Sequence, residues 1–451
     1  MANRILIPLR VVPAPAPLSD SRVVTEIYRP YFLAGILCVL TAGCALGAIA
    51  LLGVAFSRGY GLGAWTPYIL AHANSQLYGW VGLFIMGFAL QHHAPRQSRA
   101  SLFYQLAYLA LGLMVSGVVL RFVAEPLALS NRPLALVLGV LSGFLQLGAI
   151  VAFMANTALT RFSDGKGLAW TTPFVFASLT WWVLVALAEP LFFVMAHGAS
   201  AEANVRFVAE WFGPYREAQF LGFVPMMIFG VALDKMHAGF GAKPPFRHMG
   251  QAGFILWNAG LVLHMAGWIV LFRSGLASGV LYTEGGLTLL GAGVLLVLST
   301  RIFESLSESI SAQKFIRAAF AWFLVAATML ALEPFAVRLA GVPFSHAYTG
   351  AVRHALTVGF ISQMILGVGL VVVSRMNDLP YGQEPQLFLA FVLVNLGNAL
   401  RVALEAATVY TDRAFLPMGV TGMIELAGLF VWAATLVPIM VRGIRFRGAH
   451  A

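Results

Sequence analysis

Apolar stretches long enough to cross a lipid bilayer recur along the whole of this 451-residue chain. A helix needs about 20 apolar residues to span a hydrocarbon core of about 30 Å. Hydrophobic residues make up 60% of the sequence and charged residues only 10%, so no separate water-soluble domain is expected. We therefore predict an all-α polytopic membrane protein with about twelve transmembrane helices, which begin near residues 30, 68, 102, 134, 169, 215, 250, 275, 315, 346, 384 and 416.

The distribution of basic residues sets the expected orientation. With both termini on the cytoplasmic side, cytoplasmic segments hold 18 lysines and arginines and outer segments hold nine, which agrees with the positive-inside rule. This topology accounts for the net charge of +10, so the expected partner is the lipid bilayer and not a nucleic acid. Residues 1–29 and 442–451 are predicted to be flexible cytoplasmic tails on either side of one transmembrane domain, 30–441.

An internal repeat divides this domain. Glycines 79, 222 and 359, on predicted helices two, six and ten, are 143 and 137 residues apart, and each is followed eight residues later by a second glycine. The same two spacings separate Arg121, His264 and Arg401 on the next helices along the chain. Two motifs in one register predict three tandem four-helix units, at about 30–160, 169–299 and 315–441, with a site between units.

Five of the ten histidines are predicted to lie in the outer half of the membrane: His72, His197, His264, His346 and His354. An ionisable residue at this depth needs a polar partner, a cavity or a cofactor, and neutral imidazole is a common metal ligand. His72 stands seven residues before its repeat glycine and His354 five before its own, a difference of about 200° around a helix. The two side chains could therefore face one space between neighbouring units. A hydrogen-bonded packing role is the alternative for any single buried histidine.

Charged residues accompany these histidines. Two Arg–Glu pairs stand four positions apart and can form ion pairs on one helix face: Arg121 with Glu125, and Arg401 with Glu405. Arg353 precedes His354, and such an arginine could hold the carboxylates of a buried cofactor or extend to the membrane surface. The Glu-Pro pairs at 125, 189 and 333 indicate either helix ends or a polar site.

Two segments resemble the NnrS family, whose pattern is similar to subunit I of haem-copper oxidases. They are residues 72–96, HANSQLYGWVGLFIMGFALQHHAPR, and residues 353–375, RHALTVGFISQMILGVGLVVVSR. Members of this family are twelve-helix bacterial membrane proteins described as binding haem and copper, associated with denitrification and resistance to nitric oxide. The resemblance implies the oxidase scaffold, a bacterial cytoplasmic (inner) membrane location, haem b and copper as cofactors, and nitric oxide or a redox protein as partner.

Carried over residue by residue, the resemblance implies that His72 and His354 are the axial ligands of one haem, with Arg353, Arg121 and Arg401 beside it. It also implies a copper site that has fewer ligands than the oxidase site and consists of His264 and Glu217. The chain departs from the oxidase pattern at Val352, where a second histidine would bind the catalytic haem, and at Asn74, where family members can show another histidine. A complete oxygen-reducing centre is therefore not expected, and the sequence leaves open whether the protein is an enzyme.

Two further functions remain open from the sequence. A membrane transporter without a cofactor could use the same three-unit scaffold, with arginines and glutamates lining a polar path. An assembly factor for a respiratory complex would need neither buried histidine.

Overall fold

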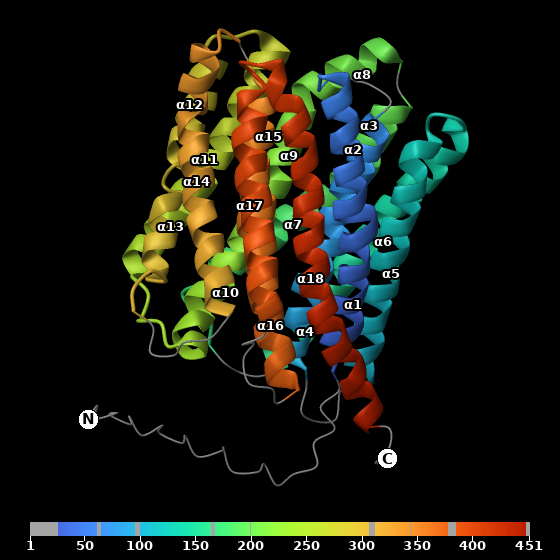
Figure 1. Cartoon of the computed structure of the whole chain (residues 1–451), viewed down its shortest axis with the longest axis vertical. Coiled ribbons are helices and arrows are strands. Elements are labelled where there is room, and N and C mark those ends of the chain that lie inside the picture. Colours follow the sequence, from blue (N-terminus) through green and yellow to red (C-terminus); the bar gives the residue numbers. More distant parts are fainter. Residues whose placement is uncertain are drawn as a thin grey trace, which may run out of the picture.

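The computed structural model describes residues 26–60, 65–94, 100–163, 167–198, 200–305, 312–342, 344–377 and 385–447, which fold into an upright bundle of helices (Figure 1). No strand occurs in these ranges. We call the end of the bundle at which the first helix begins at Tyr28 and the last ends at Arg447 the lower end, and the opposite end the upper end. Residues 1–25 and 448–451, which include most of the predicted tail 1–29 and the last four residues of the predicted tail 442–451, lie outside the described ranges.

Eleven helical segments are long and apolar enough to cross a membrane. A further unbroken helix, Thr66–His93, supplies the second predicted span; its first turns contain the polar residues His72, Asn74 and Gln76, which lower its hydropathy. The predicted all-α membrane fold is confirmed. The long helices contain π-helical turns, labelled η, and the bounds of all elements follow, grouped by predicted unit.

The first unit comprises α1 (Tyr28–Cys38), η1 (Val39–Gly43) and α2 (Cys44–Ser57); α3 (Thr66–Asn74), η2 (Ser75–Gly82) and α4 (Leu83–His93); α5 (Ala100–Leu127); and α6 (Arg132–Ser163). The second comprises α7 (Thr172–His197); α8 (Ala201–Phe207), η3 (Val208–Phe212), α9 (Gly213–Glu217), η4 (Ala218–Phe223) and α10 (Val224–Phe240); α11 (Arg247–Ser274); and α12 (Ser278–Leu290) with α13 (Gly293–Thr300). The third comprises α14 (Ala312–Leu339); α15 (His346–His354), η5 (Ala355–Ser362) and α16 (Gln363–Met376); α17 (Pro385–Ala407); and the 3-10 turn η6 (Asp412–Ala414) with α18 (Phe415–Arg447).

Two predicted boundaries are wrong. The sixth helix begins at Ala201 and not near residue 215, because the Ser200 side chain caps it by accepting a hydrogen bond from the Ala203 amide at 3.3 Å. The first turns of this helix are polar and include Glu202 and Arg206, so a hydropathy profile does not show where the helix begins. The last helix continues to Arg447, so it takes in part of the predicted tail 442–451.

The units follow one another in a closed ring. The last helix of each unit packs against the first helix of the next: α6 against α7, α12 and α13 against α14, and α18 against α2. The second helices of the three units are the most buried, since 72% of the apolar window of Glu202–Met236 and 78% of that of His346–Met376 lie inside the protein. Polar residues on these helices therefore face other helices and not lipid.

The repeat glycines are the points where the first two helices of each unit touch. A Cβ atom at Gly222 would lie 2.6 Å from Cγ of Trp181, and one at Gly359 would lie 2.5 Å from Cγ of Trp322. A Cβ at Gly79 would overlap Sγ of Cys38. Each of these glycines thus admits the side chain of the preceding helix, a common use of small residues between membrane helices.

We expect Gly359→Val to destabilise the protein by roughly 1–3 kcal/mol, because the added side chain must displace the Trp322 indole in a packed core. Size-exclusion profiles of detergent extracts should show less monodisperse protein. Gly112→Val on α5 is the matched control, since nothing lies within 4 Å of a Cβ there. Equal behaviour of the two variants would contradict the packing role of Gly359.

Candidate functional site

The second helix of each unit changes to a π-helical segment at the same register position. The segments η2, η4 and η5 begin directly after Asn74, Glu217 and His354, which are 143 and 137 residues apart. A π-helical turn has an extra residue, so it shifts the direction of the side chains beside it, and such turns are frequent at functional sites. These three positions border three spaces between units, each containing a polar cluster.

The space between the third and first units contains both histidines of the predicted haem site. Nδ1 of His72 donates to the carbonyl of Gly43 at 2.8 Å, on the π-helical turn of the first helix. Nδ1 of His354 lies 2.9 Å from the carbonyl of Gly350 and 3.2 Å from Oε2 of Glu405. Neither Nε2 atom has a hydrogen-bond partner among the described residues, so both rings present a free nitrogen.

Both rings also border partly accessible space. The side chain of His354 is 27% exposed, although its neighbours Ala351 and Ala355 are fully buried. On the next turn of the same face, Thr357 and Val358 are also partly accessible. His72 itself lies over the first helix, where a Cβ added at Gly47 would overlap its ring.

Charged and polar residues surround the two histidines. Arg401 NH2 lies 3.0 Å from Oε1 of Glu405, so the predicted Arg–Glu pair forms on α17. Electrostatic interactions connect His72 with His354 and Arg401, and connect Glu425 on α18 with His354, Arg401 and Glu405. Several buried polar atoms of this cluster have no hydrogen-bond partner among the described residues: Nε and NH1 of Arg401, Oε1 of Glu425, and both amide atoms of Asn398. Buried polar atoms are nearly always paired, so a polar ligand or water molecules would complete this cluster.

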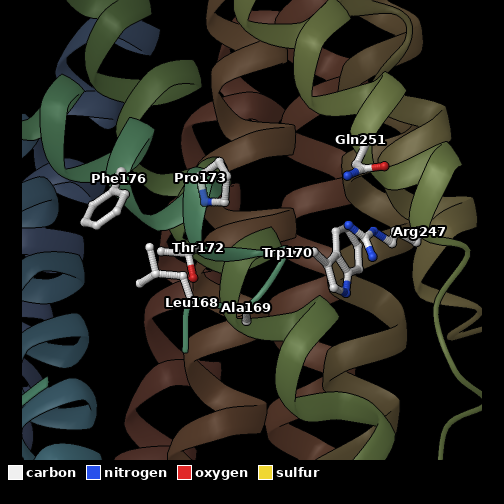
Figure 2. Close-up of a pocket in the computed structure, with 8 residues that line it drawn as sticks. All are labelled: Leu168, Ala169, Trp170, Thr172, Pro173, Phe176, Arg247 and Gln251. Carbon is white, nitrogen blue, oxygen red and sulfur yellow. The ribbon is translucent and has the colours of Figure 1, made fainter. Parts of the chain in front are cut away.

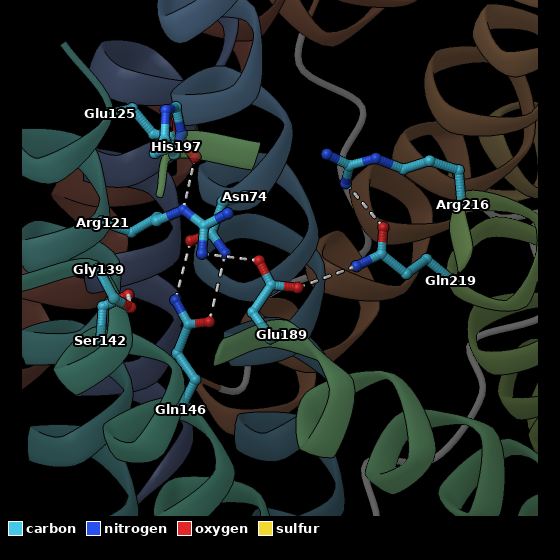
Figure 3. Close-up of polar contacts among 10 residues, drawn as sticks. All are labelled: Asn74, Arg121, Glu125, Gly139, Ser142, Gln146, Glu189, His197, Arg216 and Gln219. Atoms are coloured by element: carbon cyan, nitrogen blue, oxygen red, sulfur yellow. Dashed lines mark hydrogen bonds and ion pairs between the residues drawn. The ribbon is translucent and has the colours of Figure 1, made fainter. Parts of the chain in front are cut away.

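The space between the first and second units holds a chain of ion pairs (Figure 3). Arg121 lies between two carboxylates, with Nε 2.6 Å from Oε1 of Glu125 and NH1 2.8 Å from Oε1 of Glu189. The other oxygen of Glu125 is 2.8 Å from Nε2 of His197 at the upper end of α7. Arg121 is 5% exposed, Glu125 0% and Glu189 3%, so the network lies within the protein core.

Amide side chains extend this network (Figure 3). Gln219 accepts from NH1 of Arg216 at 2.7 Å, and its Nε2 lies 3.5 Å from Oε2 of Glu189. Asn74 and Gln146 exchange two hydrogen bonds, at 3.2 and 2.8 Å. Asn74 therefore pairs with an amide of α6, at the register position where the third unit has His354.

The space between the second and third units holds the predicted copper residues. NH2 of Arg353 is 3.5 Å from Oε1 of Glu217, and Nδ1 of His264 is 3.3 Å from the carbonyl of Thr283. His264 and Glu217 interact only at longer range. Within the described ranges, no group of three or more His, Cys, Asp or Glu side chains is placed to hold a metal ion. Two donors do not make a copper-binding set of the usual kind, so these residues do not fit copper.

Several residues of these clusters are absent from the sequence-based site. His197 and Gln219 join the network of Arg121, Gln146 pairs with Asn74 beside it, and Glu425 interacts with His354, Arg401 and Glu405. Only His197 carried a signal, its place among the outer-half histidines. The glutamate of Glu189-Pro190 belongs to a polar site, one of the two readings that the sequence left open.

Comparisons with known proteins give the fold. No protein-family model matches the chain, and no curated protein matches it. Eighteen chains of solved structures match. One, described as a heme-copper terminal oxidase dimer studied by cryo-EM, aligns with a TM-score of 0.60 at 15% identity, covering 93% of this chain and 84% of its own. At this identity the likeness concerns the fold alone: the chain is a multi-pass helical membrane protein with the fold of the haem-copper oxidase chain.

Proposed function

We propose that this protein binds one haem b through His72 and His354 and acts as an electron-transfer protein in the bacterial response to nitric oxide. The observation that carries the proposal is the pair of partly buried imidazoles in one inter-unit space, each with Nδ1 hydrogen-bonded and Nε2 without a partner among the described residues. A carbonyl that accepts a hydrogen bond from one ring nitrogen fixes the orientation of the imidazole and leaves the other ring nitrogen to bind a metal. The proposal rests on these donor atoms together with the oxidase fold.

The surrounding residues suit a haem of this kind. His72 and His354 would hold the haem, which would supply one-electron transfer when bound. The carboxylate of Glu405, with Oε2 3.2 Å from Nδ1 of His354, would make that imidazole a stronger donor. The unpartnered Nε and NH1 of Arg401 would be available for a carboxylate. Copper is not part of the proposal, because His264 and Glu217 do not fit it.

The link to nitric oxide rests on the resemblance of residues 72–96 and 353–375 to the NnrS family. Members of that family are associated with denitrification and nitric oxide resistance, and the oxidase fold of the chain agrees with the resemblance. The same resemblance supports a location in the bacterial cytoplasmic membrane, and the distribution of lysines and arginines supports both termini on the cytoplasmic side.

The direct test is a reduced-minus-oxidised optical spectrum with pyridine haemochrome quantitation, on protein purified in detergent from haem-replete cells. About one haem b per chain would support the proposal. Folded, monodisperse protein without haem would overturn it.

A second candidate function, transport without a cofactor, is favoured by the network of Arg121. Its ion pairs lead from His197 near the upper end to Glu189 and, through Gln219, to Arg216 in the core. Buried ionisable residues in membrane helices often mark a polar path. His354→Ala separates these functions: loss of a haem spectrum supports the haem protein, loss of uptake supports a transporter, and no phenotype supports an assembly factor.

The close contact between Oε2 of Glu405 and Nδ1 of His354 predicts an effect on the haem potential. We expect Glu405→Gln to retain haem but raise its midpoint potential by several tens of millivolts, roughly 1 kcal/mol, because the substitution removes a negative charge near the iron and frees the charge of Arg401. Potentiometric titration measures the shift. Glu125→Gln, at the equivalent position of the first unit, should leave the potential unchanged. Equal potentials for wild-type and Glu405→Gln protein would exclude this contact to the axial histidine.

A further inference from the structure

A cavity of about 420 Å³ lies at the lower end of the bundle, between the first turns of α7 and α11 (Figure 2). The segment before α7 closes one side of it with Leu168, Ala169 and Trp170. NH2 of Arg161 donates to the carbonyl of Gly167 at 2.7 Å and so holds the start of this segment. None of the residues discussed for the haem or for the network of Arg121 lines this cavity.

The lining is polar on the α11 side, with Arg247 and Gln251, and mainly apolar on the side of α7 and the segment before it, with Phe176 and Leu168 (Figure 2). Arg247 and Thr172 are the first residues of α11 and α7, and Gln251 lies one turn further along α11. Phe176, one turn along α7, is 52% exposed, and Leu168 is 66% exposed. In Figure 2 Arg247 lies beside Trp170, with Phe176 on the other side of the cavity. A ligand with a charged head and an apolar tail matches this arrangement.

The polar groups of the cavity are free to bind a ligand. Arg247 forms no ion pair or hydrogen bond with the described residues, and neither do the side chains of Thr172 and Gln251. The Trp170 ring packs edge-on against Phe174, while its Nε1 donates to no described residue. Tryptophan near the end of a membrane helix is typical of the membrane interface, where its ring lies among lipids and its N–H remains available.

The charge of Arg247 is not balanced by its surroundings. None of the described residues that line the cavity is acidic. The acidic residue near the start of α11, Glu304, is engaged by Arg301 at 2.7 Å and Lys243 at 2.7 Å, whose hydrogen bonds lower its pKa to about 2. The cavity is therefore complementary to a negative charge.

We propose that this cavity binds one anionic phospholipid of the lower leaflet. The phosphate would lie against the Arg247 guanidinium and the Trp170 N–H, the glycerol esters near Thr172 and Gln251, and an acyl chain along Phe176 and Leu168. Basic pockets between membrane helices bind anionic head groups in this way. The site does not depend on haem, so it stands or falls separately from the proposed function.

Native mass spectrometry of the full chain in detergent tests the site, with phosphatidylglycerol and phosphatidylcholine as probes. Wild-type protein should bind its first phosphatidylglycerol more tightly than phosphatidylcholine. Arg247→Gln should raise the dissociation constant of that first phosphatidylglycerol about fivefold, which corresponds to about 1 kcal/mol, and leave phosphatidylcholine binding unchanged. Because Arg247 is exposed, the variant should fold normally.

Lys243→Gln is the matched control, because it removes a nearby positive charge that already pairs with Glu304. This variant should bind phosphatidylglycerol as wild-type protein does. The proposal is overturned if wild-type protein does not distinguish the two lipids, if Arg247→Gln binds phosphatidylglycerol unchanged, or if Lys243→Gln weakens binding as much as Arg247→Gln.

Discussion

Replacing either His72 or His354 by alanine is expected to reduce haem content from about one per chain to less than a tenth of that. Each substitution removes one of the two axial nitrogens proposed for the iron, and a non-covalently held haem depends on both. The pyridine haemochrome of detergent-purified protein, divided by protein concentration, measures the loss.

His264→Ala is the control for these variants. His264 lies in the neighbouring space, with Nδ1 near the carbonyl of Thr283 and no proposed contact to haem. This variant should keep its haem. A parallel loss in all three variants would point to general destabilisation, and full haem in either His72→Ala or His354→Ala would exclude that residue as a ligand.

A methionine at position 72 separates ligation from packing. His72→Met replaces imidazole by a thioether, which can still bind haem iron and raises the haem potential. We therefore expect His72→Met protein, unlike His72→Ala protein, to contain haem. The midpoint potential of this haem should be higher than in wild-type protein. A His72→Leu variant that keeps its haem, although leucine has no atom that can bind iron, would favour a packing role for His72.

Replacing Arg121 by methionine is expected to destabilise the protein by about 3–5 kcal/mol. Arg121 balances Glu125 and Glu189, which are 0% and 3% exposed, so its removal leaves buried carboxylates without a cation. Breaking a buried ion pair from one side has a cost of this size. The thermal midpoint followed by tryptophan fluorescence should fall by about 5–10 °C.

Arg206→Met is the matched control for this experiment. Arg206 forms the same kind of pair with Glu210, also four residues away, but its side chain is 75% exposed. Exposed pairs contribute at most about 1 kcal/mol, so the thermal midpoint should change little.

Partial recovery of stability is expected when Arg121→Met is combined with Glu125→Gln and Glu189→Gln, because neutral amides need no cation. If the triple variant is less stable than Arg121→Met alone, the loss does not come from unbalanced charge.

Three features of the fold follow from the sequence alone: the helices, the ion pairs within a helix and the glycine positions. The apolar runs predict the helices, because only a helix satisfies its backbone hydrogen bonds within lipid. The Arg–Glu pairs at 121/125 and 401/405 follow from a spacing of four residues on one helix. The glycine register marks positions that the structure shows as contacts between the first and second helices of each unit.

Tertiary structure alone decided which of these local features meet. Glu125 pairs with His197, 72 residues away, and Asn74 pairs with Gln146 at the same separation. Such partners lie on different helices, and their distance depends on how the units close into a ring and how π-helical turns rotate side chains, neither of which leaves a periodic signal in the sequence. The contacts of the two residues for which the resemblance implied a copper site are likewise set by the fold: Nδ1 of His264 lies 3.3 Å from the carbonyl of Thr283, and Oε1 of Glu217 lies 3.5 Å from Arg353. The sequence thus determined the helices and the residues available for chemistry, and the packing of one unit against the next determined which of them share a site.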